Sequence, residues 1–149
     1  MGNQVPNTTK GMYMKGQIKA LTDVYKMILM KPGFVFDKAN HHCYADVSAS
    51  EMITAFGYTV GGSVLAGVSL TIDDVEERAE LAWNNIQWTA TGGILTISGA
   101  IIIDDTLNTA GGDDYDDGII SYKEAAVTAE DGTPIVFSSI METLEGKYI

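Results

Sequence analysis

The chain contains a single cysteine, Cys43, among its 149 residues. One cysteine cannot form an internal disulfide, so the disulfide-rich folds of small secreted domains are excluded. The only two histidines stand beside it, in the order His41-His42-Cys43. Adjacent side chains on an extended segment point to opposite faces, and a zinc site needs further His or Cys ligands that this chain lacks. Cys43 also lacks a distant histidine that could activate it as a nucleophile.

Long apolar runs are absent as well. No stretch approaches the roughly 20 residues that a membrane-spanning helix requires. The first residues, Met1 to Gln4, lack the basic start and apolar run of a signal peptide. We therefore expect a protein made in the cytoplasm that does not bind membranes.

Positive charge is scarce. Nine Lys and Arg residues stand against 20 Asp and Glu, which gives a net charge of −11. Because binding to phosphates needs clustered Lys and Arg, a nucleic-acid partner is not expected. The charge is also uneven: residues 1–40 carry +4, and residues 41–149 carry −15. A partner surface could recognise this polarity.

The hydrophobic content of 46% is sufficient for a packed core in one domain. Apolar segments of strand character alternate with turns rich in Gly, Asp and Asn. This spacing predicts a mainly β fold: an antiparallel β-sandwich or barrel-like domain of six to eight strands. The expected strand segments are 24–30, 64–73, 79–90, 94–104, 119–127 and 133–144.

Two further features complete the expected organisation. Ser48 followed three residues later by Glu51 is typical of a capping box, and Gly57 would end the short helix that starts there. Residues 1–11 are polar and show no periodicity, which indicates an extended N-terminal arm. We thus expect an arm over residues 1–11 and a single β-rich domain over residues 12–149.

The acidic stretch between two apolar strands has part of the pattern of a calcium-binding loop. If Asp113 is position 1 of an EF-hand loop, Asp117 is at position 5, Gly118 at position 6 and Glu124 at position 12, as the pattern requires. Position 3, which should supply a ligand, is Tyr115. Both flanks are also strand-like rather than helical, which argues against an EF-hand. A looser calcium site that uses Asp113, Asp114, Asp116 or Asp117 stays open as an alternative to a solvated hairpin loop.

No cofactor-binding or catalytic motif is found. Phosphate-binding loops, dinucleotide fingerprints and nucleophile elbows are all missing from the sequence. Paired carboxylates such as Asp73-Asp74 and Asp104-Asp105 fall next to turns. Hydrolysis would require one such carboxyl with a raised pKa in a cleft. We therefore expect no enzyme activity and no cofactor.

Five short motifs occur in order across residues 24–125. They are "FVFD" at 34–37, "DVSASE" at 46–51, "GYTVGG" at 57–62, "WTATGG" at 88–93 and "AIIIDDT" at 100–106. In this order and spacing the chain resembles a group of small virion proteins encoded in the structural gene blocks of tailed bacteriophages. The insert "LNTAGGDDYDDG" at 107–118 departs from that group, so its role cannot be taken from the resemblance.

The resemblance implies a structural protein of the virion, with no catalytic residues to carry over. A capsid decoration (cement) protein that binds the shell of the major capsid protein in many copies is the favoured role, as a homo-oligomer and preferably a trimer. Two alternatives stay open. One is a neck, tail or fibre-associated component that binds a receptor or carbohydrate, and the other is a calcium-stabilised or hydrolytic module.

Residues at the end of the expected arm are candidates for contact with a partner. Met12, Tyr13 and Met14 are apolar and follow a polar segment that could lie on a neighbouring subunit. The alternative is that they pack on the core of their own domain.

Overall fold

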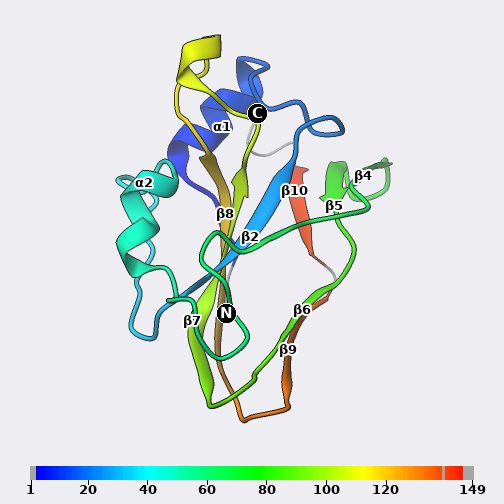
Figure 1. The fold of residues 1–149 in the computed structure, drawn as a ribbon. Helices are drawn as coiled ribbons and strands as arrows, with labels where there is room; N and C mark the ends of the chain where they lie inside the picture. Colours follow the sequence, from blue (N-terminus) through cyan, green and yellow to red (C-terminus); the bar gives the residue numbers. More distant parts are fainter. Residues whose placement is uncertain (1–2, 139, 146–149) are drawn as a thin grey trace.

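A computed structural model describes residues 3–138 and 140–145 of the chain. The chain forms antiparallel β-sheets accompanied by short helices (Figure 1). The prediction of a mainly β, sandwich-like fold is therefore confirmed. None of the helices in the described ranges is long and apolar enough to cross a membrane.

The largest sheet has five strands in the order β1-β8-β7-β2-β3. At its centre β2 (Tyr25–Met30) pairs with β7 (Leu95–Asp104), and β7 pairs with β8 (Gly118–Ala129). Two very short strands close its edges, β1 (Asn3–Gln4) beside β8 and β3 (Ser63–Val64) beside β2. The 104–118 loop joins β7 to β8, so it is a hairpin loop as expected, and it includes the turn η2 (Thr109–Gly111).

Two smaller sheets complete the architecture. One has the order β10-β5-β4, with β4 (Ser69–Asp73), β5 (Arg78–Ala82) and β10 (Met141–Glu145). The other pairs β6 (Ile86–Thr89) with β9 (Pro134–Phe137). The expected segments 64–73, 79–90 and 133–144 each divide into two strands. In the first of them Gly67 has φ +67°, a conformation that interrupts a strand.

The central strands are apolar along their length because both of their faces are covered. On β2, Met27 and Leu29 belong to the main core, whereas Ile28 and Met30 belong to a second cluster on the other face. A strand buried on both faces loses the apolar and polar alternation of a half-exposed strand. Trp83 and Trp88 are both buried in the main core, as their strand-like context predicts.

The N-terminal residues differ from the expected extended arm. β1 adds to the edge of the main sheet, and helix α1 (Asn7–Met14) runs across the expected boundary at residue 11. Thr9 donates a hydrogen bond from its hydroxyl to the carbonyl of Ile119, and Met12 is fully buried. Tertiary burial of this kind stabilises a short helix whose sequence alone would not form one.

The short helix also starts earlier than predicted. It consists of α2 (Tyr44–Val47) followed by the turn η1 (Ser48–Ser50), so the helical turns begin at Tyr44 and not at Ser48. The first turn is capped by Asp46, whose carboxylate accepts hydrogen bonds from the backbone N–H groups of His42 and Cys43. Glu51 does not cap a helix: its backbone pairs with Met30 and its side chain is buried.

Gly62 is a position where the fold requires glycine, and Gly62→Ala should destabilise the protein strongly. Its φ is +68°, and a Cβ atom there would lie 2.0 Å from the carbonyl oxygen of Met27 in β2. We expect a loss of about 3 kcal/mol in the free energy of unfolding, measured by urea denaturation. Gly61→Ala is the matched control, because Gly61 has φ +99° but open space around it. It should lose only about 1 kcal/mol, and equal losses in the two variants would contradict a steric role for Gly62.

Candidate functional site

The structure separates the three residues predicted to anchor a partner. Met12 is fully buried in the main core, and Tyr13 is partly buried against the same core. Met14, at the end of α1, is 85% exposed. The prediction is therefore wrong for Met12, because a residue that contributes to its own core cannot serve as a surface anchor.

Three of the four aspartates of the acidic loop are bound by other groups of the protein. Asp113 accepts a hydrogen bond from the N–H of Asn108, and Asp116 accepts from the N–H and hydroxyl of Thr109. Asp114 forms an ion pair of 2.8 Å with Lys15 of the segment after α1. Asp117, with φ 47°, has its pKa raised by partial burial and by the nearby charge of Asp105. Across the described ranges the structure brings no three His, Cys, Asp or Glu side chains together as a metal site.

The His41-His42-Cys43 segment is divided among different neighbours, as its extended geometry predicts. The ring of His41 stacks on Phe34, whereas the ring of His42 stacks on Tyr115 of the acidic loop. Burial and the adjacent Asp46 raise the pKa of the Cys43 thiol. Cys43 is therefore held as a thiol rather than as the reactive thiolate.

One carboxyl has a strongly raised pKa, but it lies inside the protein. Asp104 is fully buried at the end of β7, and Asp23, only 8% exposed, lies beside it. Burial and the neighbouring Asp23 carboxyl raise the pKa of Asp104 to about 8. Because Asp104 has no exposed surface, a substrate cannot reach it as a hydrolase would require. The sequence carried no signal for this pair, since its two members lie far apart in the chain.

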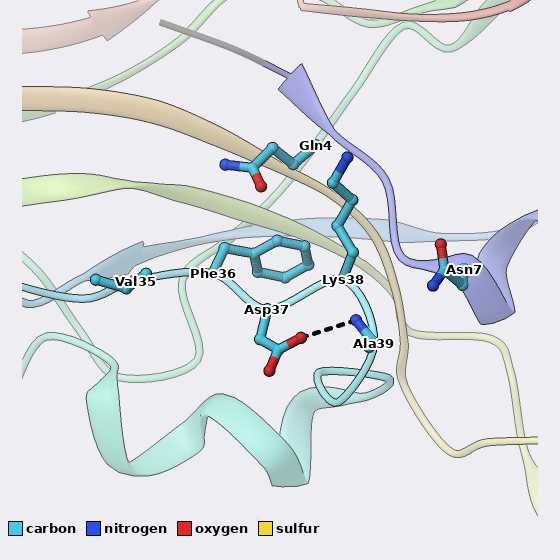
Figure 2. Close-up of a pocket in the computed structure, with 7 residues that line it drawn as sticks. All are labelled: Gln4, Asn7, Val35, Phe36, Asp37, Lys38 and Ala39. Atoms are coloured by element: carbon cyan, nitrogen blue, oxygen red, sulfur yellow. Dashed lines mark hydrogen bonds between the residues drawn. The ribbon is translucent and has the colours of Figure 1, made fainter.

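A shallow groove of about 560 Å³ lies between β1 and the segment that follows β2. Figure 2 shows the phenyl ring of Phe36 within this groove, with Gln4 and Lys38 on one side and Asp37 on the other. The carboxylate of Asp37 accepts a hydrogen bond from the N–H of Ala39 at 2.9 Å, which fixes the local turn. The groove residues are Gln4, Asn7, Val35, Phe36, Asp37, Lys38 and Ala39.

The groove has an aromatic base. Phe36 stacks on Tyr122 of β8 with 5.4 Å between ring centroids, and Phe34 packs edge-on against the same ring. The ring of His41 also contacts Phe34 and Phe36. Above this base the side chain of Val35 is 79% exposed. The groove thus combines an exposed apolar contact with a fixed polar rim, which is an arrangement typical of a protein-binding surface.

The second open surface is strand β4, at the edge of its three-stranded sheet. Its residues are exposed along most of the strand. Leu70 is 46% and Ile72 74% exposed, and they project to one face because they are two residues apart. An edge strand of this kind presents unpaired backbone groups together with apolar side chains, so it can pair with another strand. We call residues 69–73 the β4 edge.

The sequence did not single out either surface. The sequence predicted a strand over residues 64–73, and nothing in it indicated that the apolar side chains of residues 69–73 would be exposed. Val35 lies in the "FVFD" motif, whose aromatic residues are largely buried whereas the valine is not. Comparison with protein-family models, with curated proteins and with solved structures finds no match.

Proposed function

We propose that this chain is a structural protein of a tailed-bacteriophage particle, and specifically a decoration protein that binds the capsid shell in many copies. The observation that carries the proposal is the presence of two separate exposed surfaces, the groove and the β4 edge. They belong to different sheets, and in Figure 1 β4 and the segment around α2 lie on opposite sides of the molecule. The ordered motifs across residues 24–125 support the same assignment.

Two docking surfaces suit a decoration protein, because each copy contacts both the shell and its neighbours. Modest affinity at each contact is sufficient when many copies bind together. The groove is the better candidate for the shell contact. It combines the exposed apolar side chain of Val35 with two charged side chains of opposite sign, Asp37 and Lys38. An extended segment of the shell protein could lie in the groove along the edge strand β1.

Binding to particles that lack the protein tests the proposal directly. Purified protein is incubated with such particles, the particles are sedimented, and the bound copies are counted. We expect on the order of hundreds of copies per particle and a shell that resists heat better, as multivalent binding implies. About a dozen copies or fewer would instead favour a neck or tail component, and the absence of binding would contradict a virion role.

The variant Val35→Glu tests the groove within the same assay. Placing a charge on this exposed apolar residue should weaken shell binding about tenfold or more without affecting the fold. Val136→Glu on β9 is the matched control, because Val136 is also exposed, at 51%, and lies outside the groove. Equal binding by the two variants would show that the shell contact lies elsewhere.

A further inference from the structure

The β4 edge has an apolar face that its own sheet leaves uncovered. Leu70 lies opposite Leu81 of β5, which is buried in the main core, so both side chains point to the core face of the sheet. Leu70 and Ile72 nevertheless stay exposed, because no strand of the described residues pairs with the outer side of β4. One additional strand would cover both residues and satisfy the unpaired backbone groups.

We propose that this strand is β4 of a second copy, paired antiparallel about a twofold axis that passes midway between the two Thr71 residues. The axis stands normal to the sheet, and each residue i faces residue 142−i of the other copy. The result is a continuous six-stranded sheet in the order β10-β5-β4-β4-β5-β10. This contact is distinct from the threefold assembly expected from the resemblance, and it does not depend on the proposed virion role.

The sequence of β4 is complementary to itself in this register. Leu70 of one copy faces Ile72 of the other, twice, so four apolar side chains form one strip on the core face. On the opposite face Ser69 lies across from Asp73, where the hydroxyl can donate to the carboxylate, and Thr71 lies across from Thr71. Along β4, the backbone N–H and C=O groups of every second residue point away from β5. Facing residues in this register are both odd-numbered or both even-numbered, so the outward backbone groups of one strand meet the outward groups of the other.

Neighbouring registers are less favourable. A shift of the axis to residue 72 would place Leu70 against the charged Asp74, and a shift to residue 73 would place Asp73 against its own copy. A shift to residue 70 would require residues 67 and 68, which lie outside the strand, and Gly67 has φ +67°. Only the axis at Thr71 uses all five residues of β4.

The register also keeps the negative charges apart. The acidic turns at 74–77 fall at opposite ends of the paired strands, so the two Asp74 residues lie roughly 20 Å from each other at about 3.3 Å per residue. That separation exceeds the Debye length of about 8 Å at physiological ionic strength. The repulsion between two chains of net charge −11 is therefore largely screened along this edge.

Disulfide trapping tests the register residue by residue. Cys43→Ser removes the native thiol, and Thr71→Cys is added to that background. In the proposed dimer the two residues at position 71 lie about 4.5–5.5 Å apart between Cα atoms, within the range of a disulfide. The two residues at position 69 lie about 13 Å apart, beyond that range. Ser69→Cys in the same background is thus the matched control.

We expect oxidised glutathione in about 0.5 M salt to convert Thr71→Cys to a covalent dimer at least about tenfold faster than Ser69→Cys. A mixture of Ser69→Cys with Asp73→Cys should give the mixed dimer. Ile72→Lys added to Thr71→Cys should abolish trapping, since a lysine on the apolar strip opposes pairing. Equal rates at positions 69 and 71, or a monomer that sediments alone and is not trapped at position 71, would overturn the proposal.

Discussion

Asp104→Asn should stabilise this protein at pH 8 and should reduce the dependence of its stability on pH. The expected gain at pH 8 is about 3 kcal/mol in the free energy of unfolding, or roughly 6–12 °C in Tm for a chain of this size. Most substitutions of fully buried polar residues destabilise a protein, so an effect in this direction is diagnostic.

The reason lies in the pairing of two buried carboxyl groups. One oxygen of Asp104 accepts a hydrogen bond from the N–H of Thr106 at 3.0 Å. The other, Oδ2, is buried and has no donor among the described residues when both carboxyls are ionised. A proton shared with Asp23, whose own carboxylate accepts from the N–H of Lys19, satisfies that oxygen. Asparagine at position 104 keeps the acceptor toward Thr106 and supplies an N–H toward Asp23 without requiring a proton.

The direction of the pH effect follows from the raised pKa. Burial and the Asp23 carboxyl raise the pKa of Asp104 from 3.8 to about 8 in the folded state. Between these values the folded protein binds more protons than the unfolded chain, so stability falls as pH rises. The contribution of the shared proton is fully present below pH 4 and is lost as pH rises through about 8. Asparagine does not titrate, so the variant loses this part of the slope.

Urea denaturation between pH 4 and pH 9 checks this expectation. Asp105→Asn is the matched control, because it removes the same charge one residue away at a position that forms an ion pair with Lys26 near the surface. The control should change stability by no more than about 0.5–1 kcal/mol and should keep the wild-type slope. If Asp104→Asn kept the wild-type dependence of the free energy of unfolding on pH, Asp104 and Asp23 would not share a proton.

Glu51→Ala should have the largest destabilising effect among the buried polar residues. Glu51 is 4% exposed, and its Oε1 accepts hydrogen bonds from the hydroxyl of Tyr58 at 2.5 Å and from the N–H of Gly61 at 2.7 Å. Its Oε2 accepts from the hydroxyl of Tyr44. The network extends into the main sheet, because the Tyr58 hydroxyl in turn accepts from the N–H of Leu29 in β2.

Removing the carboxylate leaves three donors without their acceptor, one of them on a buried tyrosine. An unsatisfied buried donor costs about 1–3 kcal/mol. We therefore expect the free energy of unfolding to fall by about 3–4 kcal/mol in total, and Tm by on the order of 10 °C. Thermal unfolding followed by circular dichroism measures it. Glu51→Gln should recover about half of the loss, because its carbonyl can still accept from Tyr58 and Gly61.

The control for this change is Glu130→Ala, which removes an exposed glutamate next to a turn and should alter stability by less than about 0.5 kcal/mol. Tyr58→Phe gives a second test of the same network. It removes the hydroxyl that links Glu51 to Leu29, so its effect and that of Glu51→Ala should be strongly non-additive. Additive losses would show that the two side chains act independently.

The residues expected to govern stability and those proposed to bind a partner lie in different parts of this molecule. Asp104 and Glu51 are buried within or against the main sheet. The groove and the β4 edge lie at sheet edges. Substitutions of the exposed Val35 or Ile72 therefore test binding, whereas those of the buried Asp104 or Glu51 test folding.

Local patterns in the sequence determined the fold class and most of the turns. The apolar runs in 24–30 and 94–104 become the two central strands, and the acidic residues 74–77 and 105–117 become hairpin loops. These features depend on near neighbours, since strand propensity and turn chemistry act over a few residues. Burial of Trp83 and Trp88 was predictable for the same reason.

Only the tertiary structure decided the remaining features. Residues 7–14 form a helix because Met12 and Thr9 find buried partners on the main sheet. The position of α2 depends on Glu51, whose side chain accepts hydrogen bonds from residues up to ten positions away. Asp23 and Asp104 meet because adjacent strands bring their ends together. Likewise, Leu70 and Ile72 are exposed because β4 is the last strand of its sheet. Each of these outcomes depends on contacts between residues distant in sequence, and local propensity carries no information about such contacts.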